Sequence, residues 1–270
     1  MDTAPSAPGQ QTTDLDFAGR VTAIRTATTR MLGHLEAVGF GAAVPTCPEW
    51  TTRELTGHLG MVHRWATHIV ANRVTDRPDF TPERAPEGHL TEWFAAGSAA
   101  LIEALEQAPD DLQALVFLKG APAPKDFWAR RQAHETTIHG VDALAARLGR
   151  LPTTKEADLP IAVAVDGLDE LLTGFLPRRS SELRAETPLT FVVAPADADV
   201  GWTVRLSDDP PVTTRADPSG SGTADTVDAV MTGSAASLYL GLTNRGDEIA
   251  VTGEPELLGV WRDKVRIRWS

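Results

Sequence analysis

The sequence predicts a mixed fold, with a four-helix bundle over residues 14–150 and a smaller α+β domain over residues 155–270. Two observations predict this fold class. Up to residue 150, apolar residues recur at spacings of three, four and seven residues, which is typical of helices that bury one face. Beyond it, short β-branched segments bounded by Gly, Pro and Asp indicate strands. The composition changes near residues 150–157, where we expect the domain boundary.

The first two helices have recognisable ends. Residues 1–13 are rich in Pro, Gly, Thr and Gln, and we expect a disordered lead-in there, before a helix that begins near Leu15. The string GFG at 39–41 ends this helix. Thr51 and Glu54 form a capping box, so the second helix is predicted to begin at this point.

Two further helices complete the predicted bundle. The third is expected over residues 90–106 and the fourth over residues 127–149, whereas residues 111–120 fit a short helix or a strand equally well. In helix bundles, ligand sites form in the core from the side chains of facing helices. Any ligand site of this domain is therefore expected between two of these helices.

The C-terminal segments alternate between helix and strand patterns. Helices are predicted over 159–176, 233–246 and 255–265, and strands over 188–195, 200–207, 225–233 and 248–253. The segment contains no internal repeat and no glycine-rich loop that could cradle a phosphate. It is expected to form a separate α+β unit.

Charge and composition exclude several classes of partner. The formal net charge of -12 repels nucleic acid and anionic lipid, and no Lys/Arg-rich run offsets it locally. No apolar run approaches the roughly 18 residues that span a bilayer, and the N-terminus has no signal-peptide pattern. The single cysteine, Cys47, excludes an internal disulfide and fits a reducing compartment. We expect a cytoplasmic protein that binds small molecules; its oligomeric state is left open.

Polar residues on one face of the fourth predicted helix have a spacing that would let them bind a common ligand. Arg131, Glu135, His139 and Asp142 fall within a narrow arc, beside an apolar arc that faces the core. Glu135 and His139 lie one turn apart, so both side chains can reach one ion. A solvated polar face is the alternative interpretation. The zinc-protease motif HExxH is absent, because Ile138 stands four positions after His134.

A third ligand could come from the second helix. His58 lies on its apolar face, where a hydrogen-bonded core histidine is the alternative interpretation. His63 and His68 point to other faces and are interpreted as surface or flanking residues. Two imidazoles and one carboxylate, here His58, His139 and Glu135, are a common ligand set for catalytic zinc, which keeps one position open.

Three longer strings resemble one family. VPTCPEWTTRELTGHLGMVHRW (44–65) and WARRQAHETTIHGVDALAARLG (128–149) look like the motif regions of the mycothiol-dependent maleylpyruvate isomerase family, and residues 230–261 resemble its C-terminal domain. The resemblance implies a DinB-like four-helix fold followed by a small domain similar to sterol-carrier proteins. It also implies a divalent metal held by His58, Glu135 and His139. The family has Arg where this chain has His134, so the specific substrate is not carried over.

The resemblance leads to a mechanistic hypothesis. A divalent metal, zinc in the first instance, binds the sulfur of mycothiol as cosubstrate and lowers its pKa from about 8.5. The thiolate attacks a small electrophile, as in an isomerase or an S-transferase, and Glu135 sets the charge of the ion. Arg130 and Arg131 are candidates for holding a substrate carboxylate, or else form ion pairs with Asp126 or Glu135.

Three further interpretations stay open. Asp142 either orients His139 or faces solvent, and Cys47 is interpreted as structural. A metal-dependent hydrolase would use the same three ligands without any thiol. A non-catalytic protein that binds a small ligand would keep the fold and lose the metal.

Overall fold

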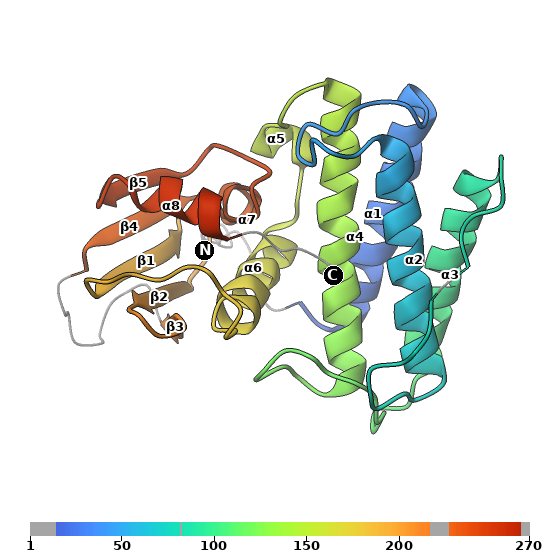
Figure 1. Cartoon of the computed structure of the whole chain (residues 1–270), viewed down its shortest axis with the longest axis horizontal. Helices are drawn as coiled ribbons and strands as arrows, with labels where there is room; N and C mark the ends of the chain where they lie inside the picture. Colours follow the sequence, from blue (N-terminus) through green and yellow to red (C-terminus); the bar gives the residue numbers. More distant parts are fainter. Residues whose placement is uncertain (1–14, 82, 217–226, 266–270) are drawn as a thin grey trace, which may run out of the picture.

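The computed structural model describes residues 15–81, 83–216 and 227–265. The predicted lead-in over 1–13 lies outside these residues, as does the start of the strand predicted over 225–233. A helical N-terminal region is followed by a mixed five-stranded sheet with its own helices (Figure 1). The predicted fold class is confirmed. The division into two folding units near residue 150 stays a prediction.

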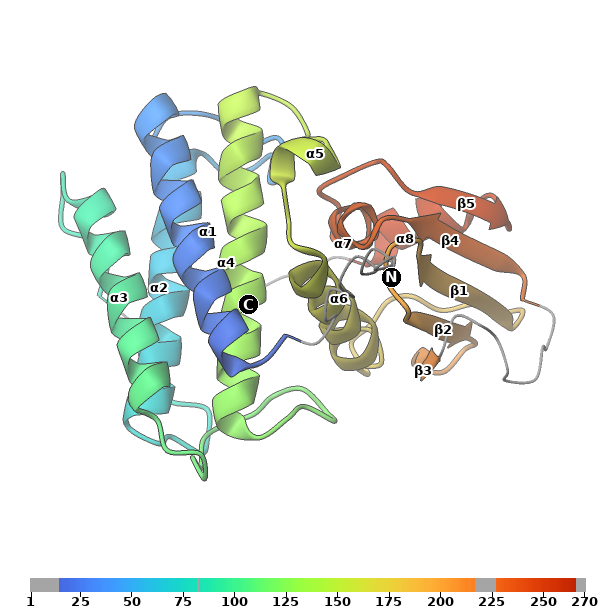
Figure 2. The same ribbon diagram turned by 180° about the vertical axis from the view of Figure 1, so that it is seen from behind.

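Four long helices form the N-terminal region. They are α1 (Phe17–Val38), α2 (Thr52–Ala71), α3 (Leu90–Gln107) and α4 (Pro124–Leu148). Both views show them side by side, with α3 at the outer edge and α4 next to the C-terminal part (Figures 1 and 2). None of the described helices is both long and apolar enough to cross a membrane.

Local signals explain where these helices begin and end. Gly39 ends α1 with φ of 70°, a backbone conformation that glycine adopts without the steric cost of a Cβ. At α2, Thr51 and Glu54 form both halves of the predicted capping box. The segment 111–120, which fitted helix or strand, is neither. The indole of Trp128 donates a hydrogen bond of 2.9 Å to the carbonyl of Leu115 and holds this segment against α4.

The C-terminal part begins with the short helix α5 (Thr154–Ala157), followed by α6 (Ile161–Asp169) and the π-helix η1 (Glu170–Phe175). Its sheet has the order β3-β2-β1-β4-β5, and the pairing is antiparallel except between β1 and β4. The strands and the remaining helices are β1 (Leu189–Pro195), β2 (Gly201–Leu206), β3 (Val212–Ala216), β4 (Ala229–Gly233), α7 (Ala235–Leu242), β5 (Ala250–Gly253) and α8 (Leu257–Lys264).

Sequence analysis missed β3 and α5. β3 is an edge strand whose Val212 is 59% exposed, so it lacks the buried alternation by which strands are recognised. The helix α5 has four residues, too few for a helical period, although its capping box at Thr153 and Glu156 is a recognisable start signal. The other predicted C-terminal elements are present, with η1 continuing α6.

Helix α4 is shared between the two parts. Most of its residues are buried all round its circumference, because α1 and α2 cover one side and residues of the C-terminal part pack on another. Ile138 packs against the core of the sheet and α6, whereas Ala133 packs in the core of the bundle. A residue on α4 can therefore connect the bundle to the sheet.

The prediction that His63 is a surface or flanking residue is wrong. Its side chain is fully buried, its Nε2 lies 2.9 Å from Thr136 Oγ1, and its ring stacks on Phe94. The reason is tertiary: α2 packs against both α3 and α4, so its buried face is wider than one apolar stripe. Burial, together with the nearby Arg64, lowers the pKa of His63 to about 3.

We expect His63 to make stability depend on pH. Below about pH 6.5 the unfolded chain binds a proton at this histidine that the folded chain does not, so stability falls as pH falls from there. The loss should approach about 1.4 kcal/mol per pH unit. Urea unfolding of wild type and His63→Gln between pH 7.5 and 5 measures this slope. The variant should lack this part of the pH dependence, and identical slopes would contradict the assignment.

Candidate metal centre

His58, Glu135 and His139 meet between α2 and α4. One ligand atom from each lies within 4.8 Å of the other two. The Nε2 atoms of both histidines face the same oxygen, Glu135 Oε1, at 3.5 Å from His58 and 3.2 Å from His139. The i,i+4 spacing on α4 places Glu135 and His139 one above the other. The packing of α2 on α4 brings His58 to them.

The ring of Trp50 lies against the two histidines of this trio. The centroid of the Trp50 ring lies 4.9 Å from that of His58 and 6.0 Å from that of His139. The two imidazoles meet edge to face with their centroids 5.1 Å apart. Trp50 precedes the N-cap of α2, so the capping box that starts this helix also positions one wall of the site.

The trio fits a divalent cation. His58 Nε2 is buried and has no hydrogen-bond partner among the described residues, although it points at a carboxylate. A buried polar atom without a partner is costly and calls for an explanation such as an ion. Two imidazole nitrogens and one carboxylate oxygen are also a donor set that suits zinc.

Asp142 orients the second histidine of the trio. Its Oδ2 lies 2.8 Å from His139 Nδ1, and the side chain is fully buried, so the solvent-facing alternative is wrong. A carboxylate on Nδ1 sets the ring orientation and leaves Nε2 to face Glu135. The stripe of α4 is therefore a connected chain of contacts, not a solvated face.

Arg245 completes this chain from the C-terminal part, and sequence analysis missed it. Its guanidinium donates two hydrogen bonds of 3.0 Å to the two oxygens of Asp142. It lies in the turn after α7, about a hundred residues from α4, and no spacing or motif in the sequence connects the two. Only the packing of the C-terminal part against α4 brings them together.

Cys47 contacts both Asp142 and Arg245. Its Sγ is 3.7 Å from Asp142 Oδ2 and 3.6 Å from Arg245 Nη2. Burial and the charge of Asp142 raise the pKa of the thiol to about 12, despite the opposing charge of Arg245. The thiol therefore stays protonated at neutral pH, which agrees with the interpretation of Cys47 as structural.

The charges of the trio depend on its neighbours. Burial alone would raise the pKa of Glu135, but His139, His58 and Arg131 outweigh it and hold this pKa well below its usual range. Burial alone would lower the pKa of His139, but Asp142 and Glu135 raise it to about 9. A cation that binds Nε2 must displace this proton, so binding is coupled to proton release.

Arg130 and Arg131, the predicted substrate-binding arginines, are both engaged by carboxylates of the chain. Arg131 Nη2 donates to Glu135 Oε2 at 3.1 Å, which is the predicted alternative, and its Nη1 contacts Glu170. Arg130 pairs with Asp166 at 3.0 Å, not with the predicted partner Asp126. Substrate binding by either arginine stays a prediction, and it would require an internal ion pair to open.

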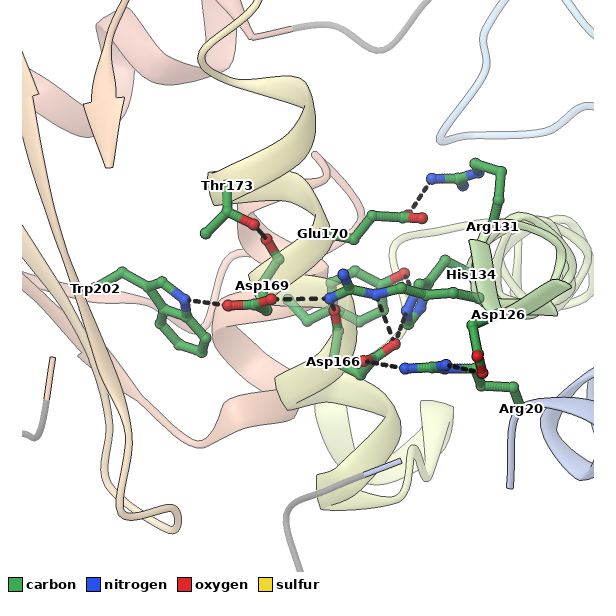
Figure 3. Close-up of polar contacts among 11 residues, drawn as sticks. Arg20, Asp126, Arg131, His134, Asp166, Asp169, Glu170, Thr173 and Trp202 are labelled. Carbon is green, nitrogen blue, oxygen red and sulfur yellow. Dashed lines mark hydrogen bonds and ion pairs between the residues drawn. The ribbon is translucent and has the colours of Figure 1, made fainter. Parts of the chain in front are cut away.

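His134 does not join the trio. Its Nε2 lies 2.7 Å from Asp166 Oδ2 (Figure 3). Its Nδ1 lies 3.2 Å from the hydroxyl of Tyr239. Asp166 also accepts from Arg20, and Asp169 bridges Arg130 to the Trp202 indole. These contacts form an ionic cluster that joins α4 and α1 to α6 and the sheet.

A cavity of about 480 Å³ lies on another face of α4. Its walls include Thr26 and Arg30 of α1, Gly140 and Leu144 of α4, and the segment 156–163. None of the three candidate ligands lines it. This cavity and the candidate metal centre are therefore separate features of the same helix.

Comparison with known proteins identifies the family. The family model described as the mycothiol maleylpyruvate isomerase N-terminal domain matches residues 21–144, and the model of the MDMPI C-terminal domain matches residues 162–259. No curated protein matches the chain.

Two solved structures share the fold. One is a crystal structure of a histidine-to-alanine mutant of the mycothiol-dependent maleylpyruvate isomerase, with a TM-score of 0.61 and 17% identity. The other is a crystal structure of that isomerase, with a TM-score of 0.55 and 18% identity. Each match covers 94% of this chain and 98% of the other. Since the two family models together span most of the sequence, the chain belongs to the mycothiol-dependent maleylpyruvate isomerase family.

Proposed function

We propose that this protein is a metal-dependent enzyme that uses mycothiol to attack a small electrophilic substrate, as an isomerase or an S-transferase. The observation that carries the proposal is the convergence of three ligand atoms within 4.8 Å, with His58 Nε2 buried and without a hydrogen-bond partner among the described residues. Membership of the isomerase family supports the choice of mycothiol as the thiol. A reducing cytoplasm suits both a thiol cosubstrate and the free Cys47.

His58, Glu135 and His139 would hold the ion, and zinc is the ion that best matches their donor atoms. When bound, a divalent cation lowers the pKa of a thiol from about 8.5, so that the nucleophile exists at neutral pH. Three protein ligands leave a position open for the sulfur. No cysteine of the chain is required as nucleophile.

The surrounding residues keep the ligands in position. Asp142 holds His139 by its Nδ1, and Arg245 holds Asp142 in turn. Arg131 occupies Glu135 Oε2, which directs Oε1 toward both histidines. Trp50 lies against the rings of both histidines and restricts their movement on that side.

Product formation from maleylpyruvate and related electrophiles, with and without mycothiol, tests the proposal. Wild type should turn over only when the thiol is present. Glu135→Gln should be slower by about tenfold or more at matched metal content, because the ion becomes more positive and a thiolate of lower pKa is a weaker nucleophile. Glu103→Gln, an exposed glutamate of α3, is the matched control and should behave as wild type.

Other outcomes distinguish the alternatives. Full turnover without thiol would contradict the thiol mechanism and favour a hydrolase that uses the same ligands. A protein that binds no metal, yet is stabilised by a small ligand, would instead be a binding protein. A thiol-dependent rate unchanged in Glu135→Gln would remove Glu135 from the chemistry.

A further inference from the structure

We infer that Glu170, in the π-helix η1, is a positioning residue for the metal centre that neutralises Arg131 and so keeps the charge of Glu135 available to the cation. The inference rests on the proposed function, because it concerns the same three ligands. Glu170 was not a candidate in the sequence, since it lies in a different element, 35 positions after Glu135. Its role follows from contacts that only the folded chain makes.

The first step is a relay of three side chains. Glu170 Oε2 contacts Arg131 Nη1, and Arg131 Nη2 donates to Glu135 Oε2 at 3.1 Å. Figure 3 shows Glu170 reaching from its helix to the guanidinium of Arg131 on α4. All three side chains are nearly inaccessible, with 3–5% of their surface exposed. Solvent therefore screens the interactions between them weakly.

The second step is that Glu170 makes no side-chain hydrogen bond other than the one to Arg131 among the described residues, although its charge also acts on Arg130. Its Oε1 is buried and has no hydrogen-bond partner among the described residues. A buried carboxylate that served the fold alone would be expected to satisfy both oxygens. The neighbouring Asp169 does so, with Arg130 on one oxygen and the Trp202 indole on the other.

The third step is the charge balance. Arg131 carries +1 beside Glu135, which carries −1, so this pair alone offers a cation no net charge. With Glu170 included, the three side chains have a formal net charge of −1. Asp142 and Arg245 cancel each other on the opposite side. A divalent ion among neutral imidazoles binds more tightly to a site of net −1 than to a neutral one.

The fourth step concerns the backbone of η1. The amide of Leu176 bonds to the carbonyl of Leu171 at 2.9 Å, which is the wide i to i+5 turn of a π-helix. The same six residues supply Phe175, whose ring centre lies 5.0 Å from the Arg131 guanidinium carbon. Glu170 and Phe175 thus hold Arg131 from the first and last residues of η1, and π-helical turns recur at functional sites.

Metal affinity measured by competition with a chromophoric zinc chelator tests the inference without reference to turnover. Glu170→Gln keeps the size and a hydrogen-bonding group but removes the charge, and should weaken zinc binding by about 10- to 100-fold. Asp169→Asn is the matched control, because it also removes a negative charge that faces α4, but this carboxylate accepts hydrogen bonds from Arg130 and the Trp202 indole. The zinc affinity of Asp169→Asn should stay within about twofold of that of wild type.

A double variant separates charge from packing. Arg131→Gln combined with Glu170→Gln restores the formal charge of −1, so zinc binding should recover most of the loss seen in Glu170→Gln. A structural role alone predicts no recovery. Wild-type affinity in Glu170→Gln, equal weakening in Asp169→Asn, or no recovery in the double variant would each overturn the inference and leave the three ligands standing. A wild-type protein that binds no zinc would overturn the metal centre and this inference together.

Discussion

Replacing His139 with alanine is expected to remove the divalent ion from the purified protein and to abolish thiol-dependent turnover. Wild type should carry about one ion per chain, since the three ligand atoms lie within 4.8 Å of one another and offer one site. The two ligands left in the variant cannot hold the ion against water, so affinity should fall by more than about 100-fold, beyond the usual effect of a residue that only contacts a ligand. Metal analysis of the two purified proteins measures the change.

Two further variants make this test specific. His58→Ala should have the same effect, although His58 comes from a different helix and is less buried. His68→Ala is the control, because it removes a histidine of α2 that stacks on Phe80 and is not part of the trio. Circular dichroism should show unchanged helix content in all three. Wild-type occupancy in both His58→Ala and His139→Ala would rule out the site.

The second large effect is expected from Asp166→Ala, which should destabilise the protein by about 3 kcal/mol. Asp166 accepts from Arg130 and Arg20 and bonds to His134, at a place where its side chain is 12% exposed. Removing one carboxylate leaves three donors with fewer partners, and uncompensated buried charge is costly. Urea unfolding at pH 7 measures the difference.

The pH dependence of Asp166→Ala provides an independent check. Burial alone would raise the pKa of Asp166, but the hydrogen bond to His134 and the charges of His134, Arg130 and Arg20 lower it overall. A carboxyl group with a lowered pKa contributes stability above its unfolded pKa of about 3.9, and this contribution is lost as pH falls below that value. The difference between wild type and variant should therefore shrink below about pH 4.

An exposed ion pair is the control for this cluster. Asp110 pairs with Lys125 at 2.8 Å, but its side chain is fully exposed. Asp110→Ala should leave unfolding unchanged within error, because exposed pairs are screened by water and salt. Equal stability of wild type and Asp166→Ala would show that the cluster does not hold α4 to the C-terminal part.

Patterns in the sequence were enough to predict most of the elements and the part of the site that lies on α4. Helical spacing located α1 to α4, the capping box located the start of α2, and β-branched segments located four of the five strands. Glu135 and His139 could be paired because an i,i+4 spacing on one helix dictates proximity without any tertiary information. The strings around His58 and Glu135 also carried the family resemblance that the comparisons support.

The contacts between residues of different elements became visible only in the folded structure. His63 became a core residue because α2 packs on two helices, and Arg130 found Asp166 instead of Asp126. Arg245 and Glu170 reach α4 from the C-terminal part, where no periodicity relates them to the residues they contact. Local spacing encodes contacts within one helix, but contacts between elements depend on how whole faces pack, which the order of residues along one chain does not display.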